Sequence, residues 1–133
     1  MVGCGRVGSK VAKKLAKSGW EVTTIDEAEE ALARLGEDWP GGFIVGHGMD
    51  VKVLREAGIE EADAVVVATN GDNTNIVVGQ VAKKRFGVEC VVVRVLDPGR
   101  AAFYASQGMQ TVCPTSNAIA VLADALRTCR TPA

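Results

Sequence analysis

The sequence predicts an α/β fold: a doubly wound parallel sheet of about six strands in three layers. Short apolar runs alternate along the chain with longer segments of helical periodicity, which is the pattern of parallel strands joined by right-handed crossovers. In addition, Val and Ala dominate the apolar residues, whereas aromatic residues make up only 5% of the 133 residues. This composition suits a buried parallel sheet covered by Ala-rich helices.

Length and charge limit the function. We expect the chain to form one domain, 1–133, without room for a substrate domain beside a dinucleotide-binding domain. Its 15 Lys and Arg nearly balance 16 Asp and Glu, so we expect no nucleic-acid partner. No apolar run approaches the roughly 20 residues of a membrane helix, so we expect no direct membrane insertion.

The predicted strands follow the apolar runs, and the first of them is unusually short. The glycine motif begins at Gly3, which leaves only Met1 and Val2 for a strand that normally has about five apolar residues in this fold. Either the chain is clipped here or a shortened central strand is tolerated, and we expect the loss to be destabilising. The other predicted strands are 22–25, 43–45, 64–68, 90–96 and 111–113.

Caps and glycines mark the predicted helices. A helix from about 6 to 18 stops at Gly19, and a final helix runs from 114–116 to about 130. Three aspartates are candidate N-caps of the helices between them, namely Asp50, Asp72 and Asp97, the last followed by Pro98. For the helix after Asp72, the periodicity predicts an inward face of Ile76, Val77, Val81 and Ala82.

The glycine-rich segment that leads into the first predicted helix carries the strongest functional signal. Gly3-Cys4-Gly5-Arg6-Val7-Gly8 matches G-x-G-x-x-G. In such a motif the first glycine permits a tight turn, the second lets the backbone approach a pyrophosphate, and the third lets helix and strand pack closely. This pattern predicts a Rossmann-like nucleotide-binding unit.

Asp26 supports the same interpretation from the end of the next predicted strand. An acidic side chain there accepts hydrogen bonds from ribose hydroxyls and repels a 2′-phosphate, which favours NAD(H) or an adenine nucleotide over NADP(H). The alternative is a surface aspartate that caps the following helix. Arg6 lies where a guanidinium could hold phosphate oxygens, although a solvated arginine is an equally good interpretation.

Further polar candidates follow later strands. Asp50 could touch the adenine edge as well as cap its helix, and His47 is expected to be a surface loop residue. Thr69, Asn70 and Asn75 follow the fourth strand at the topological switch point, where they suit phosphates, riboses or a nicotinamide; the alternative is a run of helix-capping residues. Arg94, inside an apolar run, should find a carboxylate, a ligand phosphate or a strand end facing solvent.

The cysteines predict neither a metal site nor a disulfide framework. Cys4, Cys90, Cys113 and Cys129 are scattered, contain no C-x-x-C pair and can be joined by only one histidine. Such spacing, without a signal peptide, indicates a reducing cytosol. Cys4 is expected to be small filler rather than a redox sensor.

Several stretches together resemble the TrkA-N type of RCK (KTN) domain. The resemblance covers nearly the whole chain and is more specific than the glycine motif alone. It rests on GCGRVGS (3–9), VTTID (22–26), VLREAGIEEADAVVVATNGDNTNIV (53–77), RVLDPGRA (94–101) and TVCPT (111–115).

The resemblance implies a cytoplasmic regulator of a potassium transporter or channel, held at the inner face of the membrane by that partner. It implies binding of NAD(H) or ATP/ADP, and assembly as a homodimer or a higher ring whose geometry changes with the ligand. By position, it implies a phosphate loop of Gly3, Gly5, Arg6 and Gly8, a ribose acid at Asp26, an adenine-side Asp50, a loop of Thr69 and Asn70, and a cleft-facing Arg94.

The end of the chain differs from the family pattern, and function has one competing interpretation. From the resemblance, we expect the C-terminal RCK subdomain that usually follows the final helix to be absent. The stripe Ile119, Leu122, Leu126 and Cys129 on that helix is expected to dock on a partner subunit, the alternative being its own sheet. The competing function is the cofactor-binding half of an NAD-dependent dehydrogenase, against which no acid–base constellation is evident.

Overall fold

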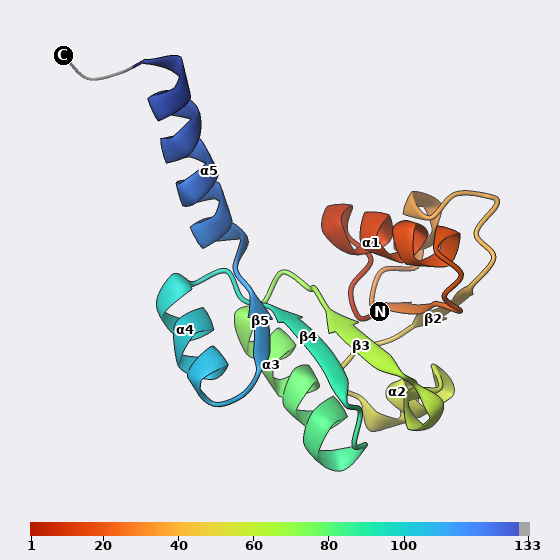
Figure 1. Cartoon of the computed structure of the whole chain (residues 1–133). Coiled ribbons are helices and arrows are strands. Elements are labelled where there is room, and N and C mark those ends of the chain that lie inside the picture. The colour runs from red at the N-terminus through yellow and green to blue at the C-terminus, as the bar shows by residue number, and fades with distance from the viewer. Residues whose placement is uncertain (131–133) are drawn as a thin grey trace.

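The computed structural model describes residues 1–130 as a body of alternating strands and helices from which one long helix, α5, projects (Figure 1). The α-helices are α1 (Arg6–Lys17), α2 (Val51–Glu56), α3 (Asp72–Gln80), α4 (Pro98–Ser106) and α5 (Pro114–Cys129). Shorter turns are the 3-10 helices η1 (Glu29–Arg34) and η2 (Ile59–Glu61) and the π-helical η3 (Val81–Arg85). The strands are β1 (Thr23–Asp26), β2 (Gly42–Val45), β3 (Ala64–Val67), β4 (Cys90–Arg94) and β5 (Gln110–Val112).

The strands form two small parallel sheets, β1–β2 and β3–β4–β5. Val2 bridges them, because it pairs in parallel with Ile25 of β1 and with Val67 of β3. Its N–H donates to Val66 O and its carbonyl accepts from Ala68 N–H, both at 2.8 Å. The alternating α/β fold with parallel strands is confirmed.

The prediction of about six strands is wrong for the part of the chain that the structure describes. Five strands are present, and a single bridging residue occupies the place of the expected first strand. The local reason is Gly3, whose φ of 97° turns the chain out of the extended conformation directly after Val2. Because Val2 still pairs on both sides, the carboxyl ends of β1 and β3 lie at the same edge.

Two apolar clusters stabilise the body. The larger contains the valines of β3 and β4, Leu54 of α2 and the inner face of α3. The smaller contains Cys4, Ala12, Ala31 and Leu35, and so joins the glycine motif to α1 and η1. Through this second cluster, the segment that follows β1 is packed against the start of α1.

Most predicted caps are confirmed. The Asp50 carboxylate accepts from Lys52 N–H at 2.9 Å at the start of α2, and Asp97 accepts from Arg100 N–H at 2.8 Å at the start of α4. Asp72 was expected to do the same for α3, but this prediction is wrong. Its carboxylate instead accepts from the N–H groups of Leu96 and Asp97, at 2.7 and 3.0 Å, and so orders the connection after β4.

The inward face of α3 is rotated relative to the prediction. Ile76 and Ala82 are buried as expected, but Val77 is 37% exposed and Val78 is buried in its place. The reason is a close contact at Gly79, where a Cβ would lie 2.5 Å from Cγ2 of Val93. The helix presents this glycine to β4, which turns Val77 outward.

The final helix does not pack on its own sheet. None of its residues is buried, and Ile119, Leu122 and Leu126 are 61%, 71% and 68% exposed. The alternative that this apolar stripe covers the sheet of its own chain is therefore wrong. No helix within residues 1–130 has the length and apolar character needed to cross a membrane.

Candidate functional site

A cleft of about 410 Å³ opens at the carboxyl ends of β1 and β3. Its walls come from the glycine loop, the β1–η1 connection, the β2–α2 loop and the β3–α3 loop. This is the edge at which open parallel sheets bind ligands, and the volume falls in the range of small-molecule sites.

The three glycines of the motif have different reasons to be glycine. A Cβ at Gly3 would lie 2.7 Å from Ala68 O, and one at Gly8 would lie 2.0 Å from Gly3 O. Gly3 was expected to permit a tight turn, and its φ of 97° agrees with that role. Gly8 was expected to allow close packing, and the backbone beside it leaves no space for a side chain. A Cβ at Gly5, by contrast, would meet nothing within 4 Å, and its φ of −82° suits any residue. Nothing within the described chain requires glycine there, although Gly5 lines the cleft.

Cys4 fastens the β1–η1 segment to the glycine loop through every polar atom it has. Its N–H donates to Asp26 Oδ2 at 2.8 Å, its carbonyl accepts from Arg34 Nη1 at 3.3 Å, and its thiol donates to Ala31 O at 3.4 Å. Burial, and secondarily the Asp26 charge, raise the pKa of this thiol, while Arg34 and Lys13 oppose them. The buried Cys4 thiol therefore stays protonated and has a structural role.

Asp26 ends β1 and lines the cleft. One carboxylate oxygen accepts from Cys4 N–H, and the other accepts from Ala28 N–H at 2.8 Å. A carboxylate has about four lone-pair positions, so each oxygen keeps one for a further donor such as a ribose hydroxyl. Both hydrogen bonds also fix its orientation before any ligand arrives.

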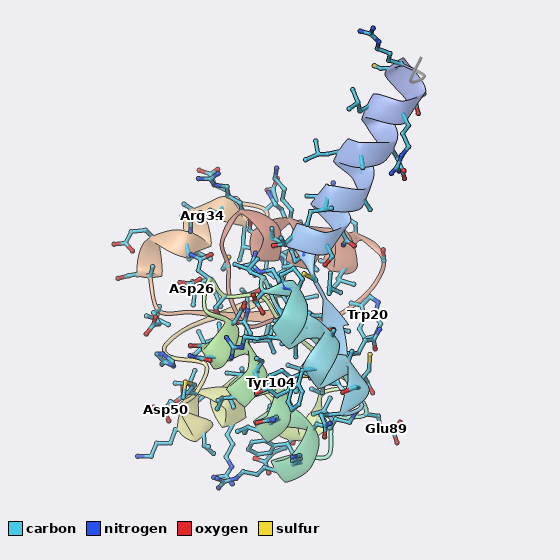
Figure 2. All side chains as sticks on the ribbon, turned by 90° about the vertical axis from the view of Figure 1, so that its left-hand side faces the viewer. Trp20, Asp26, Arg34, Asp50, Glu89 and Tyr104 are labelled. Carbon is cyan, nitrogen blue, oxygen red and sulfur yellow. The ribbon has the colours of Figure 1, made fainter. Side chains whose placement is uncertain are left out.

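Arg34 is a cleft residue that the sequence patterns did not single out. It is the last residue of η1, and Figure 2 shows it close to Asp26 on the same side of the molecule. No carboxylate of residues 1–130 lies within ion-pair distance of its guanidinium. No motif spacing marks this arginine, since only the docking of η1 on Cys4 brings it to the cleft.

Of the polar residues after β3, Asn75 differs from Thr69 and Asn70. Asn75 is completely buried, and its Oδ1 accepts from both the N–H and the hydroxyl of Thr69. Its Nδ2 donates to Thr69 O at 3.0 Å and to Arg94 O at 2.9 Å. All four hydrogen-bonding positions of the amide are used, so Asn75 ties β3 to β4. Thr69 and Asn70 themselves line the cleft.

Arg94 ends β4 beside this loop and has found no carboxylate among the described residues. Its Nη2 donates to Thr69 O and, at 3.4 Å, to Asn70 Oδ1. Its Nε is buried and has no hydrogen-bond partner within the described chain. The arginine therefore supports the Thr69–Asn70 loop, and does not itself line the cleft.

Seven of the predicted site residues are not among those that line the cleft, namely Cys4, Arg6, Val7, Gly8, Asp50, Asn75 and Arg94. Arg6 and Val7 are exposed in the first turn of α1, and Asp50 caps α2. In Figure 2, Asp50 lies well apart from the neighbouring Asp26 and Arg34. His47 does line the cleft, and its Nε2 lies 3.4 Å from Glu27 Oε1, which connects two loops at the rim.

Metal coordination has no support in residues 1–130, where no group of three or more His, Cys, Asp or Glu side chains could hold an ion. The polar groups that line the cleft instead suit a ligand with hydroxyls and phosphates. Asp26 offers acceptors, and Gly5, which cannot cap α1 with a side chain, leaves the first-turn N–H groups available to an anion.

Comparison with known proteins identifies the family of this fold. The sequence profile of the TrkA-N domain matches residues 1–115. A "Trk system potassium uptake protein TrkA" from Streptomyces coelicolor is 46% identical over 112 residues, which cover 84% of this chain and 50% of the relative. The chain spans about half the length of the curated relatives it matches.

Solved structures agree on the fold. The C-terminal domain of Kef from Shewanella denitrificans, in its AMP-bound form, has a TM-score of 0.80 at 22% identity, covering 96% of this chain and 78% of that one. GsuK bound to ADP has a TM-score of 0.82 at 23% identity, covering 97% of this chain and 33% of that one. The TrkA-N type of Rossmann-like fold is thereby confirmed.

Proposed function

Because the chain belongs to the TrkA-N domain family, a non-enzymatic family of regulatory domains, we propose that it senses an adenine nucleotide on behalf of a potassium transporter or channel. The ligand is NAD(H) or ATP/ADP, bound in the cleft between the glycine loop and Asp26. This membership also removes the competing function, the cofactor-binding half of a dehydrogenase.

The observation that carries the proposal is the space beside Gly5. Gly3 and Gly8 must be glycine for the chain to fold, but Gly5 faces an open cleft. Because no atom of residues 1–130 requires a glycine at this position, we infer that the glycine leaves space for a phosphate that contacts the backbone. Asp26 then accepts hydrogen bonds from the ribose hydroxyls, and the N-terminus of α1 faces the phosphates.

AMP and ADP in two proteins of the same fold support this class of ligand. Transmission to the transporter requires that the nucleotide bind two subunit arrangements with different affinities. The exposed stripe of α5 is the surface through which we propose that two copies form a homodimer, within which the arrangement changes. The complete regulator would sit on the cytoplasmic side of its membrane partner.

Replacing Gly5 with Ala tests the proposal. We expect Gly5→Ala to leave the melting temperature of the free chain unchanged, because the new Cβ meets nothing within 4 Å. Binding of ADP, ATP and NAD(H), measured by calorimetry, should weaken at least about tenfold, since the methyl group occupies the phosphate position.

Gly99→Ala is the matched control, because Gly99 lies in α4 outside the cleft and a Cβ there meets only Asp97 Oδ2, at 3.4 Å. It should bind nucleotides like the parent chain. The proposal is wrong if the parent binds none of these nucleotides, or if Gly5→Ala binds them as tightly as the parent.

A further inference from the structure

The packing of the residues around Arg34 determines where its side chain lies. Ala31 and Leu35, three residues before it and one after, are 0% and 3% exposed in the smaller apolar cluster. These contacts press η1 against Cys4. The Arg34 guanidinium then reaches the carbonyl of Cys4, in the middle of the glycine loop.

Most of the binding capacity of that guanidinium is unused. It has five N–H donors, of which one N–H of Nη1 donates to Cys4 O. No acidic side chain of residues 1–130 pairs with it. The result is a positive charge, anchored at one atom, on a cleft wall with two carboxylates. Asp26 is engaged by two backbone N–H groups, and Glu27 lies 3.4 Å from His47 Nε2.

We propose that Arg34 is a nucleotide-binding residue that holds the 5′-phosphate of the adenine nucleotide against the glycine loop. This inference rests on the proposed function and adds a residue to it. Asp26 and Arg34 are attached to opposite ends of the same Cys4 residue, its N–H and its carbonyl. A nucleoside 5′-phosphate offers the matching pair of groups, hydroxyls for the carboxylate and a phosphate for the guanidinium.

The 5′-phosphate fits better than a 2′-phosphate. A phosphate on the 2′ oxygen would lie against the Asp26 carboxylate, which repels it. The guanidinium is anchored to the glycine loop, where the 5′-phosphate lies next to Gly5. Because the arginine is already held at one N–H, little side-chain freedom is lost when it binds.

The test compares Arg34→Gln and Arg34→Lys with the parent chain, using adenosine, AMP, 2′-AMP and ADP in calorimetry or competition assays. Gln keeps a polar amide on a similar but shorter side chain and removes the charge. We expect Arg34→Gln to weaken AMP and ADP about tenfold and to leave adenosine within about twofold, the scale of one charged hydrogen bond. The affinity of Arg34→Lys for AMP and ADP should lie between those of the parent chain and Arg34→Gln, because lysine keeps the charge without the planar guanidinium.

Arg85→Gln is the matched control, since it removes the same charge from η3, outside the cleft. Equal losses for AMP and adenosine would overturn the proposal in favour of a purely structural tie. A larger loss for 2′-AMP than for AMP would overturn it by placing the guanidinium at the 2′ position. Unchanged AMP binding by Arg34→Gln overturns this inference alone, whereas a parent chain that binds no nucleotide overturns the proposed function with it.

Discussion

The body of the protein and α5 are built from similar apolar residues but use them in opposite ways. In the body, Val67, Val78 and Val93 are completely buried between β3, α3 and β4. In α5, Ile119 and Leu122 are more than half exposed, and no residue of the helix is buried. Figure 1 shows this helix extending away from the sheet that the others cover.

An amphipathic pattern therefore predicts that one face of a helix will be buried, but it does not predict which surface covers that face. A single helix of 16 residues is marginal in water by itself, and gains stability mainly by packing its apolar face. The body closes its core within its own chain. For α5, the surface that covers Leu122 and Leu126 has to come from elsewhere, and a second copy is our proposal.

The largest expected effect is the loss of dimerisation when the exposed stripe of α5 is made polar. We expect Leu122→Asp combined with Leu126→Asp to weaken dimerisation roughly a thousandfold or more, because burying each leucine contributes about 1.5–3 kcal/mol and each occurs twice. Light scattering and sedimentation would measure the dimer. Ala120→Glu, on the opposite side of α5 from the stripe, is the control and should remain dimeric. A parent chain that is monomeric at high micromolar concentration would contradict the interface.

A smaller effect tests how strictly the body depends on its interior. Asn75→Ala removes four hydrogen bonds and leaves the Arg94 carbonyl and Thr69 groups without this partner. We expect the free energy of unfolding to fall by about 2–4 kcal/mol, measured by urea denaturation. Asn117→Ala in α5, where the residue is exposed, should change it by less than about 0.5 kcal/mol. Equal effects of the two substitutions would show that the body and α5 do not differ in this way.

The smallest effect concerns two thiols, one in the body and one where α5 begins. Hydrogen bonds from the Ser116 side chain and backbone lower the pKa of Cys113, whereas burial raises the pKa of Cys4. A lower pKa means more thiolate at neutral pH, so Cys113 should react with iodoacetamide faster at neutral pH than an ordinary exposed thiol does. Cys4 should react only on unfolding. Ser116→Ala should slow Cys113 severalfold, and mass spectrometry of the labelled peptides would reveal an unchanged rate if the Ser116 contact has no influence.

Sequence patterns predicted the fold well where the cause was local. The periodicity of the helix after the glycine motif, the Asp50 and Asp97 caps and the apolar strands all depend on residues within a few positions of one another. The same is true of Gly3 and Gly8, whose spacing requires a tight turn and a close approach. The prediction failed at Asp72, whose carboxylate binds backbone N–H groups 24 and 25 residues away in place of its own helix.

The residues of the candidate site also fall into two groups, those that local patterns predict and those that depend on distant contacts. The positions of its glycine loop, of Asp26 and of its Thr69–Asn70 loop at the cleft could be predicted, because each ends a strand or follows a motif of known spacing. Arg34 could not, since nothing in the residues around it distinguishes a cleft arginine from a solvated one. Its place depends on Cys4, 30 positions earlier in the chain.

By itself, the sequence determined the order of strands and helices, the turns that require glycine and the family to which the chain belongs. These follow from short-range sterics and from apolar periodicity, which a linear pattern carries completely. The meeting of distant residues decided that Asn75 uses its whole amide to join Thr69 to Arg94, that Arg34 lines the cleft, and that the apolar stripe of α5 is left uncovered by residues 1–130. The physical reason is that hydrogen-bond saturation and burial depend on which distant residues meet, and those meetings exist only once the chain has folded.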